Sequence, residues 1–170
     1  MIPRYSQDKI TSIWSDKNRY EIWLNIEVLV CEKLCIDKKI SKKDFLNIKK
    51  KARIDVKDIE KLDKKTNHEV IAFLNSISKK IGNSSRYVHQ GIISSDIIDT
   101  AFSIQLKQST EIIIEDIKKF LKVLKAKAFK YKKTICLGRT HGIHAEPTTF
   151  GLKLAGFYAE MERNIERLKK

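Results

Sequence analysis

The chain has 170 residues, of which 42% are hydrophobic and 33% are charged. These proportions fit a soluble protein with one substantial core, or with one small domain and part of another. The sequence has no uninterrupted apolar run near the roughly 18 residues of a membrane-spanning helix, and its first residues lack the apolar core of a signal peptide. We therefore expect no membrane span and a cytoplasmic location.

The net charge of +14 comes from 35 basic and 21 acidic residues. Of the basic residues, 28 are Lys and only 7 are Arg, and the chain also contains 25 Ile, a combination that indicates an AT-rich coding bias. The lysines are scattered, without the interleaved aromatic residues typical of single-strand binders. We do not expect nucleic acid as a partner, although a lysine-rich module that binds RNA stays open as an alternative.

Neither cysteine nor histidine spacing predicts a metal site. Cys31, Cys35 and Cys136 contain no CxxC pair, so we expect reduced thiols. His141 and His144 form an HxxH sequence rather than the i,i+4 pair of a zincin helix, and no third ligand is indicated. A serine hydrolase is not indicated either, because the chain has no GxSxG sequence.

Only six Gly and two Pro interrupt the chain, and apolar residues recur at helical spacing through most of it. After a short first helix that closes at Trp14, the pattern predicts a helix over about 17–37. Ser41 and Asp44 form a capping box for a helix to about Ala52, and Asp55 caps another to about residue 65. A further helix begins at 67–70 and stops at Gly82.

From Ser94 to about Lys133 nothing ends a helix, and a second long helix runs from about Thr148 to the last residue. A helix of about 38 residues would span roughly 57 Å, too long for a compact single domain and suited to a long-helix bundle. We therefore predict an all-α protein with a small N-terminal helical domain, residues 1–93, followed by the start of a central bundle, residues 94–170. Its apolar surface predicts partner helices beyond residue 170 or from other subunits.

The segment between these two long helices, Gly138–Pro147, concentrates helix-breaking residues and two of the four histidines. We expect it to be a loop or a helix entry. The other histidines, His68 and His89, also lie beside breaks, whereas core histidines more often lie within apolar stripes. Because imidazole titrates near neutral pH, this distribution favours proton-transfer chemistry.

An anion is the substrate class that the same reasoning favours. Ser94, Ser95 and Asp96 open the longest helix, where free backbone N–H groups and the positive end of the dipole attract a carboxylate or phosphate. Arg4 and Tyr5 offer a guanidinium and a phenol that also suit an anion.

Six segments, in one order along the whole chain, form a recognisable set: Ile2-Pro3-Arg4-Tyr5-Ser6, Trp14-Ser15-Asp16 with Tyr20 and Trp23, Thr66-Asn67-His68-Glu69-Val70, Ser85-Arg86-Tyr87-Val88-His89 with Gly91, Ser94-Ser95-Asp96 with Asp99-Thr100, and Gly138–Pro147 continuing to Lys153. In these segments the chain closely resembles the adenylosuccinate lyase family of the fumarase/aspartase superfamily.

The resemblance implies a cytoplasmic homotetramer of long helices that uses no metal or organic cofactor. Its small-molecule substrates are nucleotides: adenylosuccinate, which yields AMP and fumarate by β-elimination, and the succinyl-carboxamide ribonucleotide of purine synthesis. It implies that His141 is the general acid, that His68 supports it, that Arg4 and Tyr5 bind the nucleotide, and that Ser94 binds a succinyl carboxylate. The remaining substrate-binding positions that it implies are Asn67, His68, Glu69, His89, Ile93, Ser95 and Thr140.

The chain departs from the family pattern at three places. Ile93 stands where the family has Thr and offers no side-chain hydrogen bond, while Asn67 and Glu69 replace a basic residue and Asp beside His68. The family's catalytic base is a serine on a Gly-Ser-Ser loop with Met-Pro-Lys-Asn residues, and this stretch does not occur here. We therefore expect these residues to be the N-terminal portion of such an enzyme, inactive alone. Argininosuccinate lyase or another fumarate-releasing relative stays open as an alternative.

Overall fold

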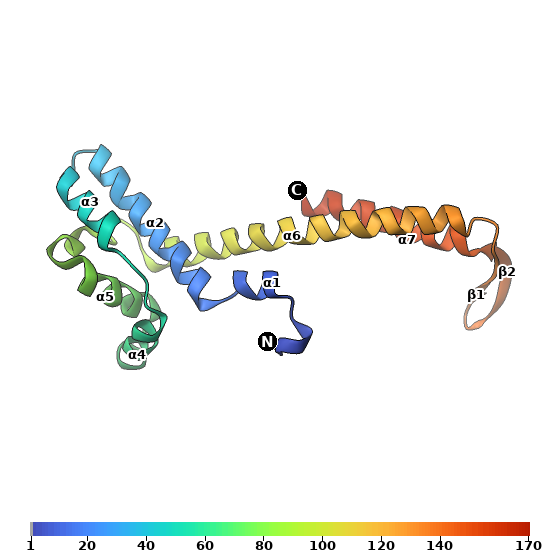
Figure 1. The fold of residues 1–170 in the computed structure, drawn as a ribbon, viewed down its shortest axis with the longest axis horizontal. Helices are drawn as coiled ribbons and strands as arrows, with labels where there is room; N and C mark the ends of the chain where they lie inside the picture. Colours follow the sequence, from blue (N-terminus) through green and yellow to red (C-terminus); the bar gives the residue numbers. More distant parts are fainter. Residues whose placement is uncertain (1) are drawn as a thin grey trace. The chain divides into compact units, whose positions relative to one another are not determined.

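The computed structural model describes residues 2–170, and within them the chain is mostly helical (Figure 1). The all-α prediction is confirmed; the only sheet among these residues has two strands. In chain order the elements are η1 (Pro3–Tyr5), α1 (Asp8–Ile13), α2 (Asp16–Ile36), α3 (Lys42–Lys51), α4 (Val56–Thr66), α5 (Glu69–Ile81), η2 (Gly82–Tyr87), α6 (Ser94–Lys130), β1 (Ile135–Thr140), β2 (Ile143–Thr149) and α7 (Phe150–Leu168).

The helix ends follow the capping chemistry that the sequence predicts. The Ser41 side chain accepts a hydrogen bond from the Asp44 backbone N–H and donates one to its carboxylate. Asp55 caps α4 in the same way, through the backbone N–H of Asp58. Gly82 ends α5 with a φ of 75°, a conformation that costs glycine little. Local side-chain chemistry thus sets three of the helix boundaries.

The chain divides into two compact units, Met1–Gln108 and Ser109–Lys170. This division falls within α6, so the first turns of that helix belong to the first unit, and the domain boundary predicted near residue 93 stays a prediction. Ile97 and Ala101, on those first turns, are buried in the core formed by α2 to α5. The centre of that core is aromatic: the Trp23 ring meets Tyr20 and Phe73 edge-on, with ring centres 5.3 and 5.5 Å away.

In the second unit, α7 runs back along the C-terminal part of α6 (Figure 1). The close approach depends on Gly151, since a Cβ there would lie 2.5 Å from the Ala128 carbonyl oxygen and 2.6 Å from Lys132 Cα. Glycine at this position lets the two backbones touch. The backbone N–H of Gly151 also donates to the Tyr131 carbonyl, which fixes the start of α7.

The segment expected to be a loop, Gly138–Pro147, is a β-hairpin instead. Its strands pair antiparallel and are joined by the two-residue turn His141-Gly142, with φ values of 51° and 77°. Two consecutive positive φ values are those of a type I′ turn, whose twist matches that of paired strands. Gly138 lies in an irregularity of the register, and a Cβ there would meet the Glu146 carbonyl oxygen at 2.6 Å. The glycines that indicated a break therefore shape a hairpin.

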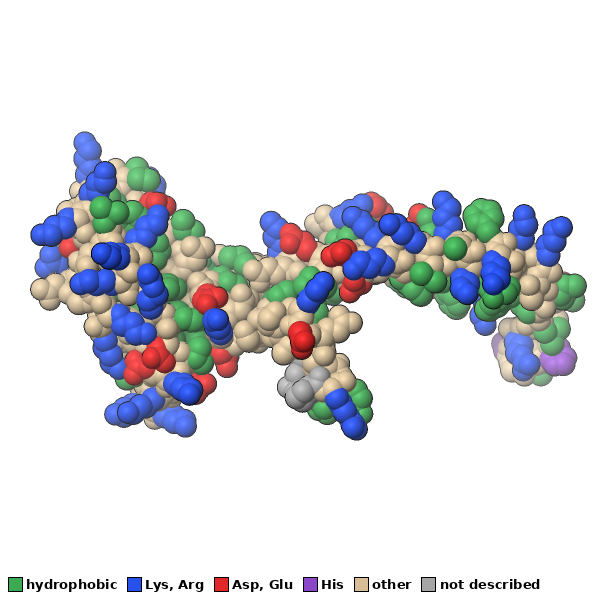
Figure 2. Space-filling view, in the orientation of Figure 1, with side chains coloured by type: hydrophobic (Ala, Val, Ile, Leu, Met, Phe, Trp, Pro, Cys, Tyr) green, Lys and Arg blue, Asp and Glu red, His purple; other side chains and the backbone are tan. Residues whose placement is uncertain are grey.

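Lysine and arginine side chains are spread over the visible surface with acidic groups among them and are not gathered into one patch (Figure 2). The three cysteines are free, and Cys31 is buried. None of the helices among residues 2–170 is long and apolar enough to cross a membrane.

Candidate functional site

Left-handed backbone conformations gather at the residues that the sequence marks as functional. Four described non-glycine residues have positive φ: Lys38, Asn67, His89 and His141. The last three are all predicted site residues. Asn and His adopt this conformation more readily than most residues with a side chain, and it turns the chain sharply at each of the three positions.

His68 is the N-cap of α5. Its Nδ1 accepts a hydrogen bond from the backbone N–H of Ile71, at 3.4 Å, while the side chain stays exposed. Asn67, just before it, ends α4 with a φ of 48°. The sharp turn between the two helices therefore presents His68 to solvent with one ring nitrogen already engaged.

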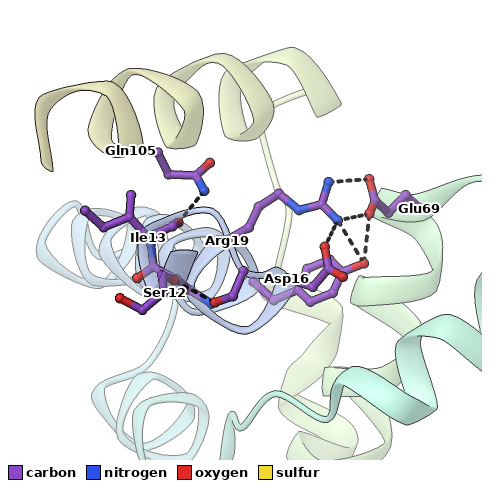
Figure 3. A network of polar contacts seen from close by, with 9 residues as sticks. Ser12, Ile13, Asp16, Arg19, Glu69 and Gln105 are labelled. Carbon is purple, nitrogen blue, oxygen red and sulfur yellow. Dashed lines mark hydrogen bonds and ion pairs between the residues drawn. The ribbon is translucent and has the colours of Figure 1, made fainter. Parts of the chain in front are cut away.

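The neighbouring Glu69 takes part in an ion-pair network (Figure 3). Arg19 donates to both of its carboxylate oxygens, and the Tyr20 hydroxyl donates to Oε1 at 2.8 Å. Arg19 also donates to Asp16 at 2.9 Å. Burial, reinforced by the Glu69 carboxylate, raises the pKa of Tyr20 well above its usual range, so the phenol stays a donor. Arg19 and Tyr20 of α2 thus hold the Glu69 side chain in place.

Arg19 and Tyr20 were missed as functional candidates by sequence reasoning, although Tyr20 belongs to a recognised motif. Arg19 borders a cleft of about 330 Å³ within the first unit. The Trp23 Nε1 and Arg19 Nε atoms are buried there without a hydrogen-bond partner among the described residues. The cleft lies among Trp14, Asp16, Arg19, Trp23, Glu69, Ile98, Asp99, Ala101, Phe102 and Gln105.

His89 follows η2, and its φ of 65° turns the chain back toward α2. There its backbone N–H donates to Glu27 Oε2 at 2.8 Å, and its Nδ1 lies 2.7 Å from Glu27 Oε1. Glu27 is only 1% exposed. Burial raises the pKa of Glu27, and the hydrogen bonds from His89 oppose that rise. Glu27 is a third residue that the sequence analysis missed, although its helical spacing from Trp23 and Cys31 places it on the buried face of α2.

At the start of α6, Ile93 stands where the family has Thr, and a neighbouring side chain supplies the capping interaction. The backbone N–H of Ile93 donates to Asp96 Oδ2 at 2.8 Å, so the capping interaction comes from Asp96. The Ile93 side chain is 65% exposed. Ser94 is half-buried and Ser95 exposed, and both lie in the first turn. The helix start therefore forms without a side-chain cap at position 93.

Arg4 and Tyr5 lie in η1 at the N-terminus, where both are exposed. The Arg4 guanidinium carbon is 5.2 Å from the centre of the Tyr5 ring, a cation–π contact that orders the pair locally.

Thr140 and His141 belong to the second unit, at the tip of the hairpin, and both are exposed. His144 is three residues further, on β2, paired with Arg139. Type I′ turns favour Asn or Gly at the position that His141 occupies. Histidine adopts positive φ more readily than most residues, so it is compatible with the turn, and its exposed ring is accessible at the tip. Within residues 2–170 no group of three or more His, Cys, Asp or Glu side chains could hold a metal ion.

Comparison with known proteins identifies the family. The model of the lyase family of the fumarase/aspartase superfamily matches residues 4–170. The chain belongs to this family. It is similar to the adenylosuccinate lyase of Staphylococcus saprophyticus, with 45% identity over all 170 residues. The lyase-family chain spans 39% of the length of that curated relative.

Solved structures share the fold. The fumarate lyase of Mesorhizobium sp. BNC1 superposes with a TM-score of 0.89 at 24% identity, over 97% of this chain and 40% of its own. The 3-carboxy-cis,cis-muconate lactonizing enzyme of Pseudomonas putida gives 0.88 at 26% identity, over 97% and 39%. The β-carboxy-cis,cis-muconate cycloisomerase of Acinetobacter calcoaceticus sp. ADP1 gives 0.85 at 23% identity, over 96% and 40%. The family fold thus carries more than one chemistry.

Proposed function

We propose that this chain is the N-terminal part of a purine-biosynthetic lyase that releases fumarate from adenylosuccinate, giving AMP, and from the succinyl-carboxamide ribonucleotide of the same synthesis. The observation that carries the proposal is the 45% identity to an adenylosuccinate lyase, sustained over every residue of the chain. Since the chain spans 39% of that relative, activity requires further residues.

The reaction is a β-elimination in which His141 acts as the general acid. A base from outside these residues removes a proton from the carbon beside a succinyl carboxylate, and the resulting carbanion is delocalised onto that carboxylate. The carbon–nitrogen bond then breaks, and His141 protonates the departing nitrogen. The exposure of His141 at the tip of the hairpin supports this role, because its imidazole is accessible to a substrate there.

The other site residues bind the substrate. His68 supports proton transfer and holds the substrate together with Asn67 and Glu69. The nucleotide meets Arg4, Tyr5 and His89, while a succinyl carboxylate meets the start of α6. Residues 93–95 and Thr140 complete the set. Free backbone N–H groups and the helix dipole suit a carboxylate at the start of α6.

The proposed enzyme is a cytoplasmic homotetramer that needs no metal or organic cofactor. The exposed apolar surface of the second unit supports an oligomer, since a surface of this kind usually meets partner helices.

A chimera tests the activity. Residues 1–170 are joined to the remaining part of the Staphylococcus saprophyticus enzyme, and fumarate release from adenylosuccinate is measured beside the parent enzyme. We expect turnover. A chimera with the parent's helical content and oligomeric state but no turnover would contradict the proposal.

The acid is tested in the same chimera by His141→Asn, with His144→Asn as the matched control. Asn tolerates the left-handed position, so the hairpin should persist while the acid is lost. General acid catalysis typically contributes about 10²–10⁴-fold, and we expect turnover to fall by that factor. His144→Asn should keep most of the activity. Equal turnover in the two variants would exclude His141 as the acid.

A second candidate is another lyase of the family, because structures with the same fold include a cycloisomerase and a fumarate lyase. Offering argininosuccinate beside adenylosuccinate to the same chimera separates the two. Preference for argininosuccinate would favour the alternative. Tight, salt-sensitive RNA binding by a chimera without turnover would favour the helical RNA-binding module instead.

A further inference from the structure

Glu27 is an unusual residue for the middle of α2, because its carboxylate is buried and its hydrogen bonds go to a single residue. Its side chain is 1% exposed, and both oxygens face His89. A buried carboxylate is costly unless it is hydrogen-bonded, so the two contacts with His89 account for its presence in the core.

The two contacts between Glu27 and His89 differ in what fixes the position of the proton. The backbone N–H of His89 is always a donor, so Oε2 must accept from it. Oε1 lies 2.7 Å from Nδ1, a distance that requires a proton between them. The second hydrogen bond of Glu27, from the His89 backbone N–H, favours its ionised form, and an ionised carboxylate can only accept, so the geometry places that proton on Nδ1. Within residues 2–170 no hydrogen bond engages Nε2, and the ring remains 21% exposed.

One turn further along α2, Cys31 holds the same segment. Its thiol donates to the Tyr87 carbonyl, with a sulfur–oxygen distance of 3.6 Å. Burial and the nearby Glu27 carboxylate raise the pKa of Cys31 to about 11, so the thiol keeps its proton. Glu27 and Cys31 together anchor residues 87–89 to α2: Glu27 through His89, and Cys31 through the Tyr87 carbonyl.

His68 is held in the opposite way. Its Nδ1 accepts from the Ile71 backbone N–H, so its ring proton must lie on Nε2 when the imidazole is neutral. The outward atom of His68 is therefore a donor. The outward atom of a neutral His89 is an acceptor, since its proton lies on the carboxylate side.

We propose that Glu27 is a positioning residue that fixes the proton of His89 on Nδ1 and directs Nε2 toward the substrate, so that His68 and His89 present opposite tautomers. The tautomer assignment depends only on this chain. The contact with substrate rests on the proposed function.

The first test is the ¹⁵N spectrum of the imidazole nitrogens in the 170-residue chain at about pH 8.5, where an ordinary imidazole is neutral. We expect Nδ1 of His89 in the protonated range and Nδ1 of His68 in the unprotonated range. The exposed rings of His141 and His144 serve as internal references. An unprotonated Nδ1 in His89 would overturn the proposal, because the proton would then lie on Glu27 or Nε2.

The variant Glu27→Gln should move the His89 ring proton to the other nitrogen rather than only remove a hydrogen bond. The single amide oxygen must accept from the His89 backbone N–H, which leaves the amide NH₂ facing Nδ1. Nδ1 must then accept, and the proton moves to Nε2. Glu32→Gln, on the same helix in an exposed ion pair with Lys49, is the matched control and should leave His89 unchanged. A folded Glu27→Gln chain with Nδ1 still protonated would overturn the assignment, and the wild-type spectrum tests it even where the variant unfolds.

The contact with substrate is tested in the chimera. Glu27→Gln should raise KM for adenylosuccinate about tenfold and change kcat little, since a hydrogen bond to a charged group is worth roughly this factor. An unchanged KM beside a shifted tautomer would overturn the contact with substrate and leave the tautomer assignment in place. Absence of turnover in the unsubstituted chimera would instead count against the proposed function.

Discussion

The two units of this chain bury their apolar residues to very different extents. The first unit encloses a continuous core in which Trp23, Phe73 and Ile77 are almost fully buried. In the second unit, the buried large apolar residues are Leu124 and Ile165, one on each helix. Many others remain exposed there, including Phe120, Val123, Phe129, Ile135, Ile143, Leu152 and Phe157.

This difference in apolar burial indicates that the two units obtain their stability from different sources. The first unit buries enough apolar surface by its own packing. The second, two helices and a hairpin, has only one face on which its helices meet, so most of its apolar residues need another partner. The proposed homotetramer would cover them.

Removing a large side chain should be costly in the first unit and nearly neutral in the second. Phe73→Ala should lower the free energy of unfolding by about 3–5 kcal/mol, because the site is fully buried and leaves a cavity. Phe129→Ala, at a residue 65% exposed, should change it by less than about 0.5 kcal/mol. Urea unfolding of the chain, followed by circular dichroism, measures both.

A decrease of more than about 2 kcal/mol in the free energy of unfolding for Phe129→Ala would contradict this difference between the units, since it would show that the surface is already covered in solution. Sedimentation of the same samples would then identify the covering partner as a second copy of the chain.

Two glycines of α7 test how much the contact between α6 and α7 contributes to the stability of the second unit. Gly151→Ala should cost about 1–3 kcal/mol, because the new Cβ would overlap backbone atoms of α6. Gly156→Ala is the matched control: nothing lies within 4 Å of a Cβ there, and alanine should stabilise the helix by about 0.5–1 kcal/mol. Thermal unfolding measures the two opposite signs. Equal effects would mean that the α6–α7 contact contributes little to stability.

The smallest effect concerns acid stability of the first unit. Hydrogen bonds from Lys79 and Ser76 lower the pKa of Asp58 below its ordinary 3.8. A folded-state pKa below the unfolded one stabilises the fold above about pH 3.8, and this contribution is lost as the pH falls through the folded value. Asp58→Asn should therefore flatten the dependence of stability on pH below 3.8. Asp63→Asn, on the same helix, is the control, and its stability should depend on pH as that of the wild-type protein does.

Helix existence and several helix ends were predictable because their causes are local. Ser41, Asp55 and Gly82 act on backbone groups within a few residues, so the order of side chains along the chain is sufficient. The long helix from Ser94 was predictable for the same reason, since no residue within it breaks the pattern.

The hairpin was not predicted, although its turn residues are adjacent in sequence. His141-Gly142 does not show the Asn-Gly or Asp-Gly pair that marks a type I′ turn, and the register irregularity at Gly138 disrupts the alternation of strand residues. The cluster of glycine and proline was correctly recognised as a break, but its form depends on pairing between strands.

The helical class, most helix boundaries and the position of the four histidines beside breaks were predictable from the chain, since each depends on neighbouring residues. The contacts of Glu27 with His89 and of Arg19 with Glu69 were not predictable in this way, because they join residues 62 and 50 positions apart. A helical pattern states which residue types share a face, and it does not state which residue of another element will face them. The ring nitrogens of His68 and His89 differ for that reason: one is set by a helix start three residues away, the other by a carboxylate that folding brings to it.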